Sequence, residues 1–307
     1  MKALAIVAAV SLAGAAHAQT LGIATMQPGT LAHTVGSSIA KVLKEKAGIN
    51  ALVQPTSGES MALAVVGKGD SALGLANAIE VGMAVPANPN LRMLGAVNPV
   101  RAGIFVRKNS PMKTIADLKG SRVPMGYAAM RALEGMSRAM LATGGLTEKD
   151  IQNVLAPNVI RAADDFVAGN ADAFLFAFGA PKVREVDVTV GGIRALEIPD
   201  SPGMAAARQH SPYGYLTEAQ PGPVFVGISQ PTKVYTFDQM LYTHAGVPDD
   251  LVYKIIDTLA NNKADLAAVA PALREFAVEN MYKNYGFTYH PGALKYFREH
   301  KLAAKDL

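Results

Sequence analysis

Two turns in the sequence carry the residue types that suit anion chemistry. The segment "IATMQPGTLAHTVG" (residues 23–36) passes from apolar residues through Pro28 and Gly29 into a helix-like run. A strand that runs into a helix leaves unpaired backbone N–H groups and a partial positive charge at the helix start, which suits a phosphate, a nucleophile or a diffusing ligand. Arg131 follows the strand-like run "RVPMGY" at an equivalent turn, and a guanidinium can bind a carboxylate with two parallel hydrogen bonds. We therefore predict that Arg131 carries the main charge contact of an anion site; a solvated surface arginine is the alternative.

The patterns of nucleotide-binding and hydrolytic sites are poorly matched. "QPGTLAHT" lacks the spacing and the lysine of a phosphate-binding loop, and "GKGDSALG" (67–74) follows a helix rather than a strand. "GDSALG" resembles the first block of a secreted GDS-type esterase, in which Ser71 would be the nucleophile. No histidine has an aspartate three residues before it, and no G-x-S-x-G turn is present. A helix-to-strand turn at Asp70 and Ser71 is the better interpretation, so the sequence predicts a protein that is not an enzyme.

Metal and thiol chemistry have no basis in the sequence. The chain has no cysteine, which excludes disulfides and thiol catalysis. Past the first 18 residues the histidines are scattered and form no H-x-x-x-H pair, so we expect no metal and no cofactor. Among them, His33 is of interest because it lies one turn into the first expected helix, although a partly exposed helix histidine is the commoner case.

Composition and the first residues indicate an exported protein of two lobes. Residues 1–18, "MKALAIVAAVSLAGAAHA", have an early lysine, an apolar stretch and an A-x-A site, as a cleavable signal peptide does. No later segment is apolar enough to span a membrane. The chain has 307 residues and a net charge of +4 without a basic cluster, so nucleic acid is not expected as a partner. A chain of this size divides into two lobes more readily than it builds a single core.

The order of expected elements predicts the fold class. Helical spacing of apolar residues begins at Leu31 and stops near Gly48, and a strand, turn, helix, strand unit occurs at 21–76 and again at 121–178. Such alternation favours mostly parallel sheets flanked by helices. We therefore predict an α/β, two-lobed binding-protein architecture with a two-strand hinge near 100–108 and 234–243. Lobe 1 is expected to comprise 19–103 plus 238–307, and lobe 2 to comprise 104–237.

Several segments resemble, in order, those of the TAXI family of TRAP-transporter solute receptors. The resemblance spans nearly the whole mature chain, and its most specific feature is the order of the segments together with the late "HPGALKYF". The segments are "IATMQPGTLAHTVGSSIAKVL", "VQPTSGESMALAVVGKGDSALGLAN", "FVRKNSPMKTIADLKGSRVPMG", "AADDFVAGNADAFLFAFGAP", "GVPDDLVYKIIDTL" and "HPGALKYFRE".

The resemblance implies a periplasmic receptor, expected to act as a monomer, that delivers an organic acid such as glutamate or 2-oxoglutarate to the permease subunits of a TRAP transporter. Carried over by position, the implied ligand-binding residues are Thr25, Gly29, Thr30, His33, Ser57, Gly58, Ser60, Asn77, Tyr127, Met130, Arg131, Phe178 and Gly179.

The sequence also departs from the family pattern. It has fewer glycines in "MQPGTLAHT" and "YAAMRAL" than family members usually have there, which implies more side-chain contact and a ligand that differs from glutamate, such as an aromatic or bulkier acid. A tripartite tricarboxylate transporter receptor, which shares the architecture, and the less favoured esterase are the alternatives.

Overall fold

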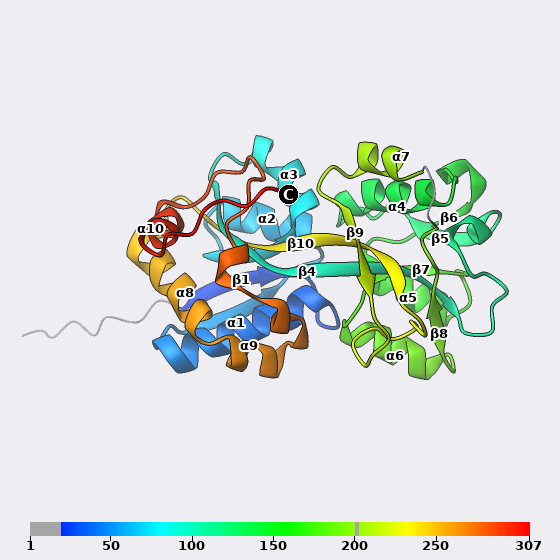
Figure 1. The fold of residues 1–307 in the computed structure, drawn as a ribbon, viewed down its shortest axis with the longest axis horizontal. Coiled ribbons are helices and arrows are strands. Elements are labelled where there is room, and N and C mark those ends of the chain that lie inside the picture. The colour runs from blue at the N-terminus through cyan, green and yellow to red at the C-terminus, as the bar shows by residue number, and fades with distance from the viewer. Residues whose placement is uncertain (1–19, 200–202) are drawn as a thin grey trace, which may run out of the picture.

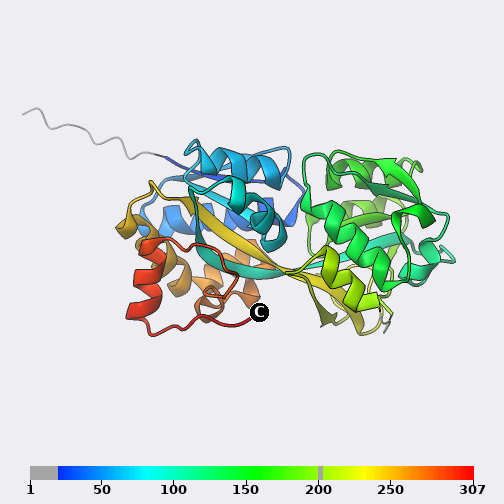
Figure 2. The same ribbon diagram turned by 90° about the horizontal axis from the view of Figure 1, so that it is seen from above.

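The chain forms two lobes that lie side by side. The computed structural model describes residues 20–199 and 203–307, so the expected signal peptide at 1–18 lies outside the described residues. Figure 1 shows the lobes joined by two long strands, β4 (Leu91–Arg107) and β10 (Thr232–His244). In Figure 2 the blue, cyan, orange and red segments make up one lobe, called lobe 1 here, and the green to yellow segments make up lobe 2. Both chain ends of the described part thus belong to lobe 1.

The other strands are β1 (Leu21–Thr25), β2 (Ala51–Pro55), β3 (Leu73–Asn77), β5 (Arg122–Met125), β6 (Gln152–Leu155), β7 (Phe174–Ala177), β8 (Ile193–Ala195) and β9 (Tyr215–Ala219). The α-helices are α1 (Leu31–Ala47), α2 (Glu59–Gly67), α3 (Ala78–Ala84), α4 (Ala132–Thr143), α5 (Val159–Val167), α6 (Pro181–Thr189), α7 (Gly203–His210), α8 (Asp249–Asn261), α9 (Lys263–Val269) and α10 (Pro291–Glu299). Short 3-10 turns are η1 (Val85–Ala87), η2 (Ile115–Leu118), η3 (Glu148–Asp150), η4 (Pro271–Glu275) and η5 (Val278–Asn280).

One mixed sheet runs through both lobes in the order β2-β1-β3-β10-β4-β7, with β8 also paired to β4 and β9 to β10. In lobe 1, β1 pairs in parallel with β2 and β3, and α1 and α2 lie on opposite sides of β1 (Figure 1). Lobe 2 adds a separate parallel pair, β5 and β6. The two-lobed α/β architecture predicted from the sequence is confirmed.

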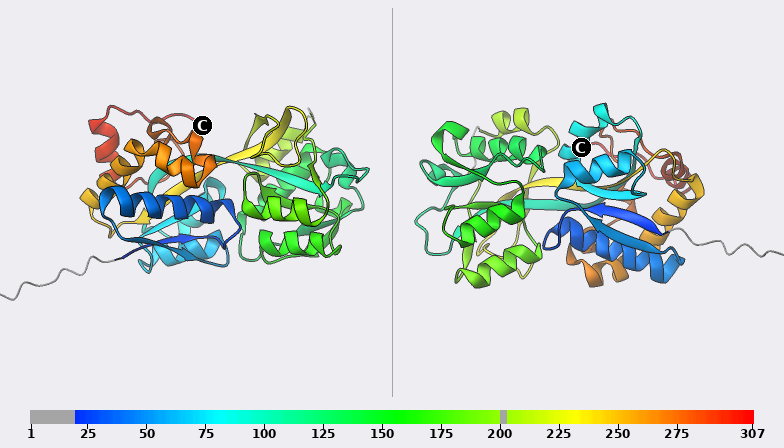
Figure 3. Two further views of the ribbon diagram at one scale, coloured as in Figure 1. Left: turned by 90° about the horizontal axis from the view of Figure 1, so that it is seen from below. Right: turned by 180° about the vertical axis from the view of Figure 1, so that it is seen from behind.

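Strand direction in lobe 2 differs from the sequence-based expectation of a mostly parallel sheet. Both β7 and β8 run antiparallel to β4. The reason is that β4 enters lobe 2 from lobe 1 and itself serves as the central strand, so its direction is set outside the repeated strand, turn, helix, strand unit. Figure 3 shows this crossing from below and from behind.

The two crossings form one antiparallel ribbon. The first of them, β4, is a single 17-residue strand that extends through both lobes. Pro99 lies inside it, opposite Asp238, and the register shifts between Gln239 and Met240, one residue further along β10. Bulges are where a sheet tolerates a proline, which lacks the N–H that a regular ladder needs. The hinge segments predicted at 100–108 and 234–243 therefore belong to two paired strands.

Several helices begin or end at residues whose local chemistry favours a helix end. Thr30 caps α1 through its side chain, which accepts a hydrogen bond from the His33 N–H, and Gly48 ends α1 in the left-handed conformation (φ 66°). Thr114 and Asp117 form a capping box at η2. Over the described residues, no helix is both long enough and apolar enough to cross a membrane.

Candidate ligand-binding site

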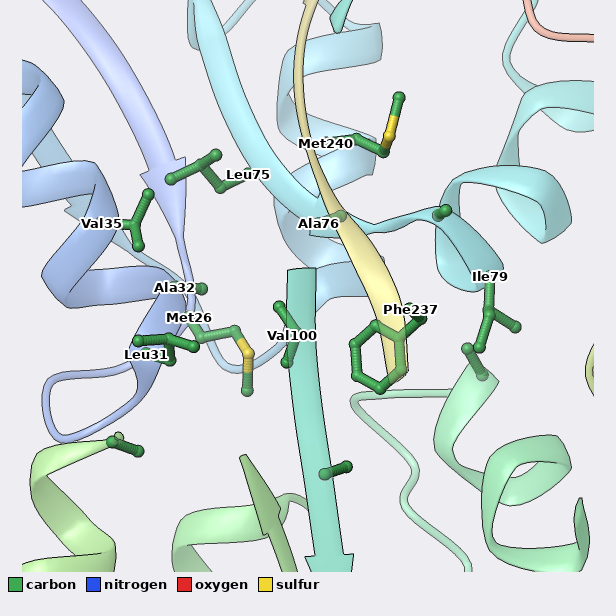
Figure 4. Packing of buried hydrophobic residues seen from close by; sticks show 14 of the residues in the cluster. Met26, Leu31, Ala32, Val35, Leu75, Ala76, Ile79, Val100, Phe237 and Met240 are labelled. Atoms are coloured by element: carbon green, nitrogen blue, oxygen red, sulfur yellow. The ribbon is translucent and has the colours of Figure 1, made fainter. Parts of the chain in front are cut away.

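A cavity of about 60 Å³ lies where the two crossing strands meet both lobes. Figure 4 labels five of its lining residues, Met26, Leu31, Ala32, Val100 and Phe237. The cavity is smaller than the ~150 Å³ apolar cavity that accommodates benzene in another protein. A ligand of more than a few heavy atoms therefore requires side chains or lobes to move apart. The apolar lining residues are Met26, Leu31, Ala32, Val100, Ala102, Met130, Leu133, Met136, Val159, Leu175, Phe176, Ala177 and Phe237.

The lobes touch on two sides of this cavity. On one side, the N–H of Lys182 in lobe 2 donates to the carbonyl of Gly29 in lobe 1, at 3.1 Å. On the other side, Gly58 of lobe 1 packs so close to lobe 2 that a Cβ built on it would lie 2.1 Å from the Ala129 carbonyl oxygen. Only glycine permits that approach, because any other residue would place an atom inside the contact distance. The structure thus represents a closed arrangement of the lobes.

The polar end of the cavity is formed by lobe 1 and by β10, with Thr30, Glu59, Asn77 and Gln239 as the polar lining residues. Glu59, in the first turn of α2, accepts a 3.0 Å hydrogen bond from the Asn77 N–H through Oε1, and its Oε2 contacts Asn77 Nδ2. Asn77 is the N-cap of α3, so its Oδ1 is already bonded to the Glu80 N–H at 2.8 Å. The amide orientation of Asn77 is therefore fixed by the helix cap, and its NH₂ group is directed at Glu59.

Burial changes the ionisation of Glu59. Its side chain is almost inaccessible, with 3% of the residue exposed. Desolvation, helped by the neighbouring Glu80 carboxylate, raises the pKa of Glu59 to about 8, against the lowering effect of the Asn77 hydrogen bonds. Glu59 is therefore mostly a neutral carboxylic acid at neutral pH in this closed arrangement.

Gln239 lies beside this acid with an unused donor. It is 2% exposed and pairs in register with Asn77 on β3 and Asn98 on β4. Its side-chain Nε2 has no hydrogen-bond partner among the described residues. A buried amide N–H group without a partner costs free energy, so the position favours a ligand that brings an acceptor.

Glu80 connects the two lobes directly. Its Oε2 accepts a 2.7 Å hydrogen bond from the N–H of Ala132, the first residue of α4 in lobe 2, and its Oε1 contacts the Ser60 hydroxyl. The α4 N-cap residue, Arg131, contributes no side-chain cap of its own. Desolvation raises the pKa of Glu80, although its hydrogen bonds and Arg131 act in the opposite direction. The helix start that the sequence suggested for a ligand anion is thus occupied by a carboxylate of the protein itself.

The structure brings some of the sequence-predicted residues together at the cavity and leaves others around it. Thr30, Asn77 and Met130 line the cavity. Gly29, Gly58, Ser60 and Arg131 lie at the two lobe contacts. Thr25 is buried behind the α1 start, where its hydroxyl lies 3.3 Å from His33 Nδ1, and Ser57 is exposed.

Three further candidates belong to lobe 2 and do not line this cavity. Tyr127 is buried and donates from its hydroxyl to the Pro124 carbonyl at 3.0 Å. Phe178 packs against Phe105 and Phe225, and Gly179 follows it with φ 79°. The predicted role of these residues in ligand binding stays a prediction.

Arg131 is exposed at the N-cap of α4, with its backbone N–H 3.4 Å from the Ser60 hydroxyl oxygen. Its guanidinium interacts electrostatically with Glu80 and is not part of the cavity lining. The sequence-based prediction of a main charge contact at Arg131 remains untested in this arrangement.

Sequence reasoning missed Glu59, Glu80 and Gln239. A glutamate in a first helical turn is ordinarily a solvated partner of the helix dipole, so the pattern gave no reason to place it in a cavity. Gln239 had a detectable signal: with Asp238 it interrupts the otherwise apolar strand pattern "VYTFDQMLY". Over the described residues, no group of three or more histidines, aspartates and glutamates could hold a metal ion.

Comparison with solved structures places the fold among periplasmic binding proteins. PhnD1 from Prochlorococcus marinus, solved with methylphosphonate, is similar with a TM-score of 0.60 and 11% identity over 93% of this chain and 100% of that chain. A putative periplasmic sulfonate-binding protein, SsuA of a sulfonate ABC transporter from Methylobacillus flagellatus KT, has a TM-score of 0.53 and 15% identity over 94% and 97%. A structure described as a periplasmic transporter has a TM-score of 0.57 and 16% identity over 92% of each chain.

At such low identities, these likenesses establish the two-lobed fold only. The sequence itself gives a more specific assignment. The profile of the NMT1-like family matches residues 23–300, nearly the whole described chain, and the protein therefore belongs to the NMT1-like family.

Proposed function

We propose that the protein is a periplasmic solute receptor that captures a small carboxylate-bearing molecule between its two lobes and delivers it to a membrane permease. The observation that carries this proposal is the cavity enclosed where both lobes meet the two crossing strands. Two-lobed binding proteins commonly close about a hinge on their ligand, and we propose the two crossing strands β4 and β10 as that hinge. The carboxylate class follows from the sequence resemblance, which names organic acids such as glutamate and 2-oxoglutarate.

The proposed role is binding without chemical change. Ser71, the one candidate nucleophile considered, donates its hydroxyl to the Leu73 carbonyl at 3.1 Å and is 2% exposed. A serine hydroxyl engaged within its own turn supports the structural interpretation of "GDSALG" over the esterase. Recovery of unaltered ligand after incubation is expected; turnover of an ester that Ser71→Ala abolishes would contradict the proposal.

A thermal-shift screen of carboxylates on the mature chain tests the binding role. A ligand present at about 100 times its dissociation constant stabilises a fold by ~2.7 kcal/mol. Gly58→Ala is the matched variant, because a methyl group there meets the Ala129 carbonyl and holds the lobes apart. We expect it to weaken binding of any hit by about tenfold or more, and to enlarge the radius of gyration in small-angle scattering. Gly120→Ala, at a position with open space around it but positive φ, controls for backbone strain.

The permease class is proposed separately. The ordered motifs of the sequence support a TRAP-type secondary transporter, whereas the name of one structural neighbour, a sulfonate ABC transporter protein, favours an ATP-driven permease as the second candidate. Uptake into cells that express the receptor with its neighbouring permease genes distinguishes them. Collapse of the ion gradient is expected to stop uptake by a secondary transporter, and selective loss on ATP depletion with the gradient intact would favour the ATP-driven class.

A further inference from the structure

The charge of the cavity lining bears on which carboxylates it accepts. Among the described residues that line the cavity, Glu59 is the one ionisable side chain, and none is a lysine, arginine or histidine. Arg131, the cation that the sequence suggested for an anion contact, is exposed and interacts electrostatically with Glu80. Burying a negative charge without a positive partner is costly. A dicarboxylate would bring two such charges to a cavity that already contains an acid.

The lining offers one donor and one acceptor in adjacent positions. Gln239 Nε2 lacks a partner among the described residues and lies in a cavity wall. Glu59 is bonded to Asn77, the residue opposite Gln239 in the strand register, whose N–H and amide both contact the carboxyl oxygens of Glu59. With Asn77 donating to both oxygens, a ligand group that approaches Glu59 is favoured when it is a further donor.

We propose that the ligand is a zwitterionic α-amino acid with a small apolar side chain, whose ammonium group faces Glu59 and whose carboxylate accepts from Gln239. This inference rests on the proposed function and narrows its carboxylate class. The zwitterion has no net charge, so it satisfies both polar groups without burying an unpaired anion. The methionine, leucine, valine and phenylalanine side chains of the lining would contact the ligand side chain. Because the closed cavity of about 60 Å³ holds only a few heavy atoms, any amino acid requires lining side chains or lobes to move apart, and a short aliphatic side chain requires less movement than an aromatic one.

The proposal predicts that ligand binding releases a proton from Glu59. In the closed arrangement without ligand, Glu59 is mostly protonated at neutral pH, because burial raises its pKa to about 8. An ammonium group against Glu59 stabilises the carboxylate, so the Glu59 proton passes to the buffer as the ion pair forms. Glu80, Tyr242 and Arg131 are the other titratable groups acting at this position.

Four probes separate the parts of the proposed ligand. L-Valine carries both head groups, isovalerate lacks the ammonium group, isobutylamine lacks the carboxylate, and 2-oxoglutarate represents the dicarboxylates. We expect valine to bind at least about tenfold more tightly than each of the other three by calorimetry. Titrations in two buffers of different ionisation enthalpy are expected to report release of close to ~1 proton per bound valine near neutral pH.

Two site variants and two matched controls assign the contacts. Glu59→Gln keeps the shape and an acceptor for one of the two Asn77 hydrogen bonds but removes the ionisable group. It is expected to abolish proton release and to reduce the preference for valine over isovalerate to about threefold or less. Gln239→Met removes the donor, and we expect valine to bind about fivefold to tenfold more weakly.

The matched controls are Glu45→Gln and Gln220→Met, both at exposed positions, which are expected to change neither the proton release nor the affinity for valine. Circular dichroism confirms that each variant folds, and Gln239→Met tests the assignment independently of Glu59.

The outcomes distinguish this inference from the proposed function. Tighter binding of 2-oxoglutarate or isovalerate than of valine would overturn the inference and leave a carboxylate receptor in place. Equal binding of isobutylamine and valine would overturn the assigned carboxylate contact at Gln239. If no compound in a broad carboxylate panel binds, the proposed function fails as well.

Discussion

Two neighbouring residues of β10 face opposite sides of the hinge and differ in how completely they are bonded. Successive side chains of a strand point to opposite faces, so Asp238 and Gln239 lie back to back. Asp238 accepts from the Tyr215 hydroxyl at 3.0 Å and contacts Lys283 Nζ and the Tyr285 hydroxyl. Gln239 lines the cavity with an unpartnered Nε2 within the described part of the chain. The fully bonded side is expected to hold the fold together, and the incompletely bonded side to bind a ligand.

The same contrast holds for the buried carboxylates. The Asp238 carboxylate has a cation, Lys283, beside it. Next to this cluster, Arg101 makes a two-bond ion pair with Glu275 at 2.6 and 2.9 Å and also donates to the Thr217 hydroxyl. Within the described residues, Glu59 has only the groups of Asn77 as hydrogen-bond partners, and a second carboxylate, Glu80, is nearby. Substitutions on the Asp238 side should therefore affect stability, and substitutions on the Glu59 side should affect pH dependence and ligand binding.

The largest expected effect is on the Asp238 side. Asp238→Ala leaves Lys283 and two tyrosine hydroxyls without their shared acceptor, and breaking such a buried pair costs roughly 3 to 5 kcal/mol of unfolding free energy. Urea unfolding measures it. Asp250→Ala is the control, because Asp250 pairs with Lys295 at 3.3 Å with 92% of its side chain exposed, and exposed pairs contribute about 0 to 1 kcal/mol. Equal losses in the two variants would contradict the contrast drawn here.

The second effect concerns pH. The folded-state pKa of Glu59, about 8, lies above the unfolded value of 4.5, so its proton stabilises the folded state below pH 4.5, and this stability is lost as pH rises toward 8. Each unit of such a shift corresponds to ~1.4 kcal/mol, so a few kcal/mol are at stake. We expect Glu59→Gln to flatten the fall in unfolding free energy between about pH 5 and about pH 8. A fall of the same steepness in the variant would assign the pH dependence to other groups, Glu80 first among them.

The sequence predicted the framework of this contrast better than the site. Local turn chemistry and strand patterning, which a sequence displays directly, determine several features of the framework. These are the two ends of α1 at Thr30 and Gly48, the capping box at Thr114 and Asp117, and the crossing strands. Such features depend on residues close together in the chain.

The site depends on contacts between distant segments. Glu80 meets the start of α4 some fifty residues away in sequence, and Glu59 is buried because α2 begins against lobe 2, with Gly58 as its N-cap. The antiparallel direction of β7 and β8 likewise follows from the path of β4 across the hinge. Helical or strand periodicity contains none of this information, which explains why the predicted set contained cavity residues from turns, Thr30 and Asn77, but not the buried acids.

A smaller effect is expected at the lobe contact. Glu80 caps α4 from the opposite lobe, and loss of a cap costs about 0.5 to 2 kcal/mol. Glu80→Ala is therefore expected to shift the lobes toward an open arrangement by about 1 kcal/mol, visible as a larger radius of gyration without ligand. Glu80→Gln retains an acceptor oxygen and is expected to shift it less. Identical scattering from the parent and Glu80→Ala would mean that this contact does not hold the lobes closed.

The smallest expected effect is at Arg131, where two hypotheses about the site predict different losses of ligand affinity. If its guanidinium binds the ligand carboxylate as the sequence suggested, Arg131→Ala removes one partner of a desolvated pair, which costs roughly 2 to 5 kcal/mol, or about 30-fold or more in affinity. In the closed arrangement Arg131 is exposed, lies outside the cavity lining and interacts electrostatically with Glu80. We therefore expect Arg131→Ala to weaken ligand binding by about threefold or less, under ~0.7 kcal/mol.

Calorimetry with the best ligand of the screen decides between the two hypotheses for Arg131. Arg131→Lys adds a check, since lysine keeps the charge but cannot reproduce a two-bond carboxylate contact. A large loss in Arg131→Ala that Arg131→Lys restores only in part would move the anion contact from the Gln239 wall of the cavity to the start of α4.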